Sequence, residues 1–156
     1  LISFVGPRPG CRFSNSNEVA VRASARFCDV VSFNKYQRSL SGFSLPEGVD
    51  RPVVIGEFHF GALDRWKLHT GLRSVANQVD RGDAYRHYVE TALLHPNIVG
   101  THWFQYGDQA TTGRFDGENY QIGFVTMCDS PYAETVKASR EVGYDLYRFR
   151  IDGESR

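Results

Sequence analysis

The stretch PVVIGEFHFGALDRW, residues 52–66, decides the fold of this chain. It begins as a run of apolar, mostly β-branched residues and then brings Glu57, His59 and Asp64 within a few positions. A short apolar run without polar alternation is typical of a strand in a parallel sheet that is covered on both faces. The polar side chains are therefore predicted to lie where a buried strand ends.

Similar apolar runs alternate along the chain with helical patterns. In the clearest helical pattern, apolar residues recur at i, i+3, i+4, i+7 and i+8 from Tyr85 to Leu93, and Pro96 ends it. We expect strands over residues 1–5, 28–33, 52–58 and 97–104. We expect helices over residues 17–27, 78–95 and 131–147, with at most a short helical turn in KYQRSLSG, residues 35–42.

This strand–helix order predicts an α/β fold with a parallel sheet and right-handed crossovers. Four βα units make half of a TIM (β/α)8 barrel, and no Gly-rich phosphate loop supports a dinucleotide-binding fold. We therefore expect residues 1–156 to be a single partial domain of a longer protein, with residues 148–156 as a frayed tail. The start without Met agrees with this interpretation.

Composition excludes several classes of function. Lys plus Arg equals Asp plus Glu at 18 each, so a nucleic-acid partner is not expected, and no apolar run is long enough for a membrane span. The three cysteines lie far apart without CxxC spacing, which predicts small buried side chains rather than disulfides or a zinc site. No signal peptide is visible, and no cofactor is indicated.

Two helix starts are predicted from capping residues. Asn17 and Glu18 suit an N-cap and a first turn, so we do not interpret this Asn-Glu pair as catalytic. In the same helix Val19, Ala23 and Phe27 are expected to share the apolar side. For the last helix we expect Ser130 as N-cap, with Pro131 at the first helical position.

Glu57 is the leading catalytic candidate because it falls where a parallel strand emerges at the mouth of a barrel. Gly56 beside it is expected to leave room for a substrate. A carboxylate that caps a helix or pairs with an arginine is the alternative. Asn34 and Tyr36 follow the preceding strand and are both expected to reach the mouth and bind substrate, with Tyr36 also within hydrogen-bonding reach of a catalytic carboxylate. Turn formation would explain Asn34 equally well.

His59 lies two residues beyond Glu57 and is expected to share its face of the strand. It is interpreted either as a hydrogen-bonding residue of an organic site, which we favour, or as a metal ligand together with His102 and Asp108. Asp64 is expected to order the following loop rather than to act in catalysis.

Two long loops, residues 59–77 and 105–129, follow the third and fourth strands, on the side where barrels build active sites. The second loop and the strand end before it mix aromatic, amide and carboxylate side chains, which suits sugar binding. The absence of a basic cluster favours a neutral saccharide. The mixture comprises Trp103, Gln105, Asp108, Gln109, Arg114, Asp116, Glu118, Asn119 and Tyr120.

Four blocks of the sequence together resemble the C-terminal half of the catalytic barrel of the β-agarases of glycoside hydrolase family fifty, a family of retaining glycosidases. The blocks are CDVVSFNKY (28–36), VVIGEFHFGALDR (53–65), PNIVGTHWFQYGDQ (96–109) and TGRFDGENYQIGFV (112–125). The resemblance implies that the strands are the fifth to eighth of the barrel, that Glu57 is the nucleophile and that Trp103 stacks on a sugar. It also implies an agarose-type polysaccharide substrate and a secreted or periplasmic protein.

The resemblance implies a deficit as well. The acid/base glutamate of this family, with an Asn before it, belongs to a fourth strand that the chain does not contain. We therefore expect the isolated chain to be inactive. Two other interpretations stay open: a non-catalytic carbohydrate-binding module and a metal-dependent barrel hydrolase. The resemblance is compatible with agarose and with related galactans as substrate, and with endo as well as exo action.

Overall fold

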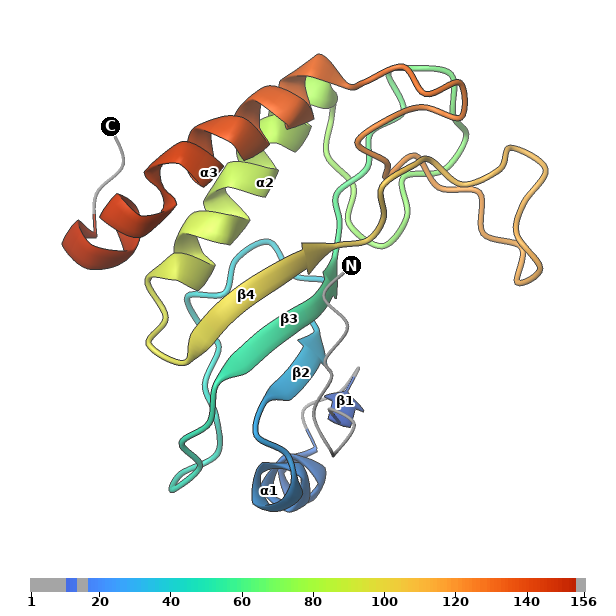
Figure 1. The fold of residues 1–156 in the computed structure, drawn as a ribbon. Coiled ribbons are helices and arrows are strands. Elements are labelled where there is room, and N and C mark those ends of the chain that lie inside the picture. The colour runs from blue at the N-terminus through green and yellow to red at the C-terminus, as the bar shows by residue number, and fades with distance from the viewer. Residues whose placement is uncertain (1–10, 14–16, 154–156) are drawn as a thin grey trace.

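In the residues that the structure describes, the sheet consists of four parallel strands in the order β1-β2-β3-β4 (Figure 1). The computed structural model describes residues 11–13 and 17–153. The strands are β1 (Cys11–Phe13), β2 (Val31–Asn34), β3 (Val53–Phe58) and β4 (Ile98–Trp103). The helices are α1 (Glu18–Phe27), α2 (Gln78–Leu93) and α3 (Ala133–Asp152).

Three predicted strands are confirmed, with ends that differ by up to three residues from β2, β3 and β4. The strand predicted at residues 1–5 lies outside the described residues. The described β1 at Cys11–Phe13 was not predicted, and it pairs with β2 through Cys11 and Val31. Residues 35–42, where at most a short helical turn is expected, contain bends and a single turn closed by the Phe43 amide on the Leu40 carbonyl, and no helix.

The start of α1 is as predicted, but its orientation is not. The Asn17 side chain accepts from the Val19 amide, and Glu18 pairs with Arg22 one turn later. The expected apolar side is wrong: Val19 is 76% exposed and Phe27 is 58% exposed. Val21, Ser24 and Ala25 are buried instead, because α1 presents this other side to the protein.

The start and end of α3 also correct the prediction. Tyr132 is the N-cap, so Ser130 and Pro131 precede the helix, and Pro131 instead forms an isolated bridge with Val125. The helix continues to Asp152, where Gly153 closes it at a φ of 77°. Residues 148–152 are therefore helical rather than frayed, and residues 154–156 lie outside the described residues.

The apolar stripe predicted for α2 is confirmed. Tyr88, Val89 and Ala92 are buried, and α2 and α3 lie side by side over the sheet (Figure 1). The Tyr88 ring stacks on Phe58 of β3 with 4.1 Å between ring centroids. Since side chains alternate along a strand, Phe58 in the core places Glu57 on the opposite side of β3.

Of the cysteines, Cys28 is buried as predicted, whereas Cys128 is exposed and corrects the prediction. The side chain of Cys11 is outside the described part. None of the helices in residues 17–153 is long and apolar enough to cross a membrane.

Candidate active site

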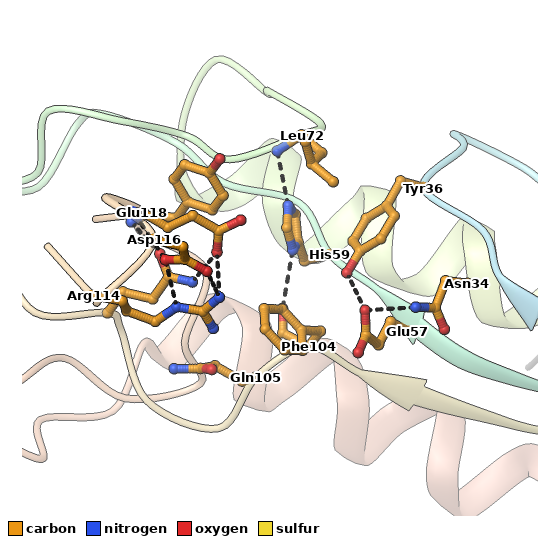
Figure 2. A network of polar contacts seen from close by, with 12 residues as sticks. Asn34, Tyr36, Glu57, His59, Leu72, Phe104, Gln105, Arg114, Asp116 and Glu118 are labelled. Atoms are coloured by element: carbon orange, nitrogen blue, oxygen red, sulfur yellow. Dashed lines mark hydrogen bonds and ion pairs between the residues drawn. The ribbon is translucent and has the colours of Figure 1, made fainter. Parts of the chain in front are cut away.

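Glu57 lies at the carboxyl end of β3 and receives two side-chain hydrogen bonds on the same oxygen. The Asn34 amide donates to Glu57 Oε2 at 2.9 Å, and the Tyr36 hydroxyl donates to it at 2.7 Å. The pairing of Asn34 with Glu57 across β2 and β3, at a register shift, brings the three residues together (Figure 2). Two donors on one carboxylate favour its ionised form and fix its direction.

Gly56 does not leave room for a substrate, which corrects the expectation. A Cβ at this position would lie 2.8 Å from Ser32 Oγ and 3.1 Å from Asn34 Oδ1. The side chains of β2 occupy this space. Gly56 therefore serves the site by allowing Asn34 to approach close enough to bind Glu57.

His59 is only 1% exposed, and both of its ring nitrogens are engaged. Nδ1 contacts the Phe104 carbonyl oxygen at 3.1 Å, and Nε2 accepts from the Leu72 amide at 2.9 Å (Figure 2). Burial lowers the pKa of His59 to about 4. The hydrogen bond to the Phe104 carbonyl raises the pKa in part, and the positive charge of Arg81 lowers it further. This histidine is a poor fit to the predicted substrate contact or metal ligand.

Trp103, predicted to stack on a sugar, is half-buried at the end of β4. Its indole Nε1 donates to the Ile122 carbonyl at 2.6 Å, and its ring lies edge-on to Phe58 at 5.2 Å. The guanidinium carbon of Arg81 lies 5.5 Å from the centre of the indole. The structure thus packs this ring against the core and leaves only part of it open to a ligand.

Arg81 of α2 is fully buried and was missed by the sequence analysis. It donates to the carbonyls of Phe60 and Gly123 and to the side chain of Gln78. Burial lowers its pKa to about 10, although nearby acidic groups oppose the shift. Helical periodicity predicts which side of α2 carries residue 81, but the sequence carries no signal that two loops will surround its side chain.

Asp108 and Gln109, both predicted to bind substrate, form hydrogen bonds that hold their own loop. Asp108 Oδ1 accepts from the amides of Ile122 and Gly123, and Oδ2 accepts from the Tyr132 hydroxyl at 2.6 Å. The Gln109 side chain is buried, accepts from the Tyr120 amide and donates to Glu118. Their polar atoms are used in folding the segment.

The tip of this loop carries a cluster of opposite charges. Arg114 pairs with Asp116 and, at 3.1 Å, with Glu118, and its guanidinium carbon lies 5.7 Å from the Phe104 ring centre (Figure 2). The hydrogen bond with Asp116 raises the pKa of Arg114 and lowers that of the carboxyl. Gln105 donates to the Gly107 carbonyl at 3.1 Å. Asn119 is half-buried on the same loop.

Asp64 orders the loop, as predicted. Its two carboxylate oxygens accept from the backbone amide and the side chain of Gln78, each at 3.0 Å, at the first residue of α2. Within the described residues, no group of three or more His, Cys, Asp or Glu side chains could hold a metal ion.

Known β-agarases are similar in sequence to this chain. No protein-family model matches the chain. Over 133 residues it is 42% identical to Beta-agarase B of Vibrio sp. (strain JT0107), covering 83% of the chain and 14% of that protein. Over 148 residues it is 41% identical to Beta-agarase A of the same organism, covering 88% of the chain and 15% of that protein.

A solved structure gives the same result in three dimensions. The crystal structure of an agarase, AgWH50C, superposes with a TM-score of 0.86 at 44% identity, covering 90% of this chain and 21% of that one. The homologues of the chain are therefore β-agarases. The chain spans only 14% and 15% of the length of the two curated relatives.

Proposed function

We propose that the chain belongs to glycoside hydrolase family fifty and forms the C-terminal half of a retaining β-agarase barrel, strands five to eight. The observation that carries the proposal is the Glu57 carboxylate at a strand end, held by Asn34 and Tyr36. The β-agarase homologues support the same class. We call the longer protein that contains this chain the parent protein.

In this proposal Glu57 attacks the anomeric carbon of a β-galactosidic linkage. A second carboxyl group, about 5 to 5.5 Å away in retaining enzymes, protonates the leaving oxygen and then activates the water that releases the sugar from Glu57. That second group would come from the upstream half of the parent protein. The balanced overall charge of the chain supports a neutral galactan such as agarose as substrate.

The exposed edge of the structure supports the half-barrel interpretation. β4 lies at one end of the described sheet, and Tyr144, Tyr147 and Ile151 of α3 are exposed apolar side chains at helical spacing. A complementary set of βα units would cover both. An upstream strand of the parent protein that ends in Asn-Glu would support this arrangement, and its absence would contradict it.

The test of the nucleophile is Glu57→Gln in the parent protein. We expect kcat on agarose to fall by several orders of magnitude, as loss of a nucleophile does. The exposed Glu47→Gln serves as the matched control and should retain wild-type turnover. Azide should restore activity to Glu57→Ala by attacking from the vacated side, and near wild-type turnover in Glu57→Gln would reject the assignment.

The purified 156-residue chain is expected to be inactive, because it supplies one carboxylate of the pair. Incubation with agarose and chromatography of the products tests this. Release of neoagaro-oligosaccharides by the isolated chain would refute the half-barrel proposal.

A further inference from the structure

We propose that His59 is a positioning residue, which holds the Tyr36 hydroxyl against Glu57 and joins the segments that follow β2, β3 and β4. The inference rests on the proposed role of Glu57 as nucleophile. It replaces the substrate contact expected from the sequence, because a side chain that is 1% exposed with both nitrogens engaged offers no polar group to a sugar.

The hydrogen bonds of His59 fix its tautomer. The Leu72 backbone N–H can only donate, so Nε2, which lies 2.9 Å from it, is the unprotonated nitrogen. Nδ1 therefore carries the proton and donates to the Phe104 carbonyl at 3.1 Å. One neutral imidazole thus connects the loop after β3 to the first residue after β4 (Figure 2).

The ring of His59 also supports Tyr36. The two rings meet edge-on with 4.7 Å between their centroids, and the Tyr36 hydroxyl is the group that donates to Glu57 at 2.7 Å. Tyr120 contacts the histidine from another side, at 6.1 Å between centroids. With its ring confined in this way, Tyr36 keeps its hydroxyl directed at the carboxylate.

Gly71 shows how closely the loop is fitted to this histidine. Its φ is +75°, and a Cβ at this position would lie 2.6 Å from His59 Nε2. A side chain at residue 71 would be strained by its backbone conformation and would collide with the ring. The loop can therefore deliver the Leu72 amide to Nε2 only with glycine before it.

The surroundings keep His59 neutral. Besides burial, the groups that face the ring include the Arg81 guanidinium from α2, the Tyr36 phenol after β2 and the Tyr120 phenol from the second loop. A protonated ring would lose the bond from Leu72, since both nitrogens would then donate. The same geometry that positions Tyr36 thus depends on an uncharged imidazole.

The test compares His59→Asn, Tyr36→Phe and the double variant in the parent protein, using agarose as substrate. Asn keeps a donor near Nδ1 and loses the acceptor for Leu72. We expect each single variant to lower kcat by about tenfold to a hundredfold with KM nearly unchanged, and to move the acidic limb of the pH–rate profile to higher pH. In the Tyr36→Phe background, His59→Asn should lower kcat further by less than about twofold.

Three outcomes would overturn the inference: a raised KM with unchanged kcat, additive effects in the double variant, or an unmoved acidic limb. If His59→Asn does not fold, Gly71→Ala, which displaces the ring, is compared with Tyr36→Phe in the same way. Retained turnover in Glu57→Gln would reject the proposed function itself. Loss of turnover there, combined with additive His59 and Tyr36 effects, would remove only the positioning role.

Discussion

The carboxyl end of β3 and the loop of residues 105–129 carry the same kinds of polar side chain but use them differently. Glu57 receives hydrogen bonds from Asn34, the last residue of the neighbouring strand β2, and from Tyr36, which follows that strand. In the loop, Asp108 and Gln109 accept from the backbone amides of their own segment. A segment without regular structure must satisfy its backbone with side chains, so its polar composition overstates its capacity to bind a ligand.

The largest effect on stability is expected from Asp108→Ala. This change removes the acceptors of the Ile122 and Gly123 amides and of the Tyr132 hydroxyl. Three bonds to a carboxylate should cost about 4 kcal/mol in the free energy of opening the loop. Hydrogen exchange of the parent protein measures this directly, since protection of the two amides should fall by about a thousandfold.

The matched control is Asp108→Asn, which keeps one carbonyl oxygen for the amides and should lose much less protection. A higher KM for agarose in Asp108→Ala, with amide protection unchanged, would instead mean that Asp108 contacts the substrate. The conclusion that the loop uses its polar side chains for its own backbone would then be wrong for Asp108.

The next effect concerns His59, which follows β3 directly and faces Tyr120 of the loop of residues 105–129. Its pKa is lowered from 6.5 to about 4, so the opened state binds a proton more readily than the closed state between these values. The His59 contribution to the stability of the closed form of the loop of residues 59–77 is therefore complete above pH 6.5. It declines as the pH falls toward 4, by about 3 kcal/mol in all.

Exchange of the Leu72 amide, corrected for the intrinsic pH dependence, reports this decline, because that amide donates to His59 Nε2. His59→Gln, which keeps an acceptor near Nε2, should show weaker protection with no such pH dependence. Protection of the Leu72 amide that stays constant from pH 7 to 4 in the unmodified protein would show that the imidazole does not govern the loop.

A smaller effect separates two amide side chains, one from each region. Asn34→Ala removes a donor to Glu57 and should lower kcat by about tenfold with little change in stability. Gln109→Ala should do the reverse, since this buried side chain joins Tyr120 and Glu118 within the loop. Steady-state kinetics and thermal unfolding of both variants decide the matter; equal kinetic losses would contradict it.

The same contrast explains what the sequence predicts and what it does not. Local patterns and the geometry of parallel strands predict β2, β3 and β4, the apolar stripe of α2 and the position of Tyr36 near Glu57. The orientation of α1 and the start of α3 do not. Val19 and Phe27 have the spacing of a buried side, but tertiary packing selects Val21 and Ala25.

The long-range contacts of the site are the least predictable part. Arg81 binds the Phe60 and Gly123 carbonyls, and Gly71 abuts His59, through segments whose paths no periodicity describes. The sequence shows that Gly71 and Arg81 are present, but it cannot show which buried groups they will meet. The composition of the loop predicts substrate contacts, but it does not show that Asp108 and Gln109 also form hydrogen bonds to the backbone of the loop itself.

The smallest effect is expected at the loop tip, where Arg114 pairs with Asp116 and Glu118 on partly exposed side chains. Surface pairs gain little because water screens them, and salt screens them further. Asp116→Asn should therefore change thermal unfolding of the parent protein slightly at low salt and not at all near 1 M salt, about where the screening length falls to a few ångströms. If the variant instead raises KM for agarose at every salt concentration, the loop tip binds substrate. Residues 114–118 would then belong with the catalytic strand end and not with the part of the loop whose polar side chains bond to the loop itself.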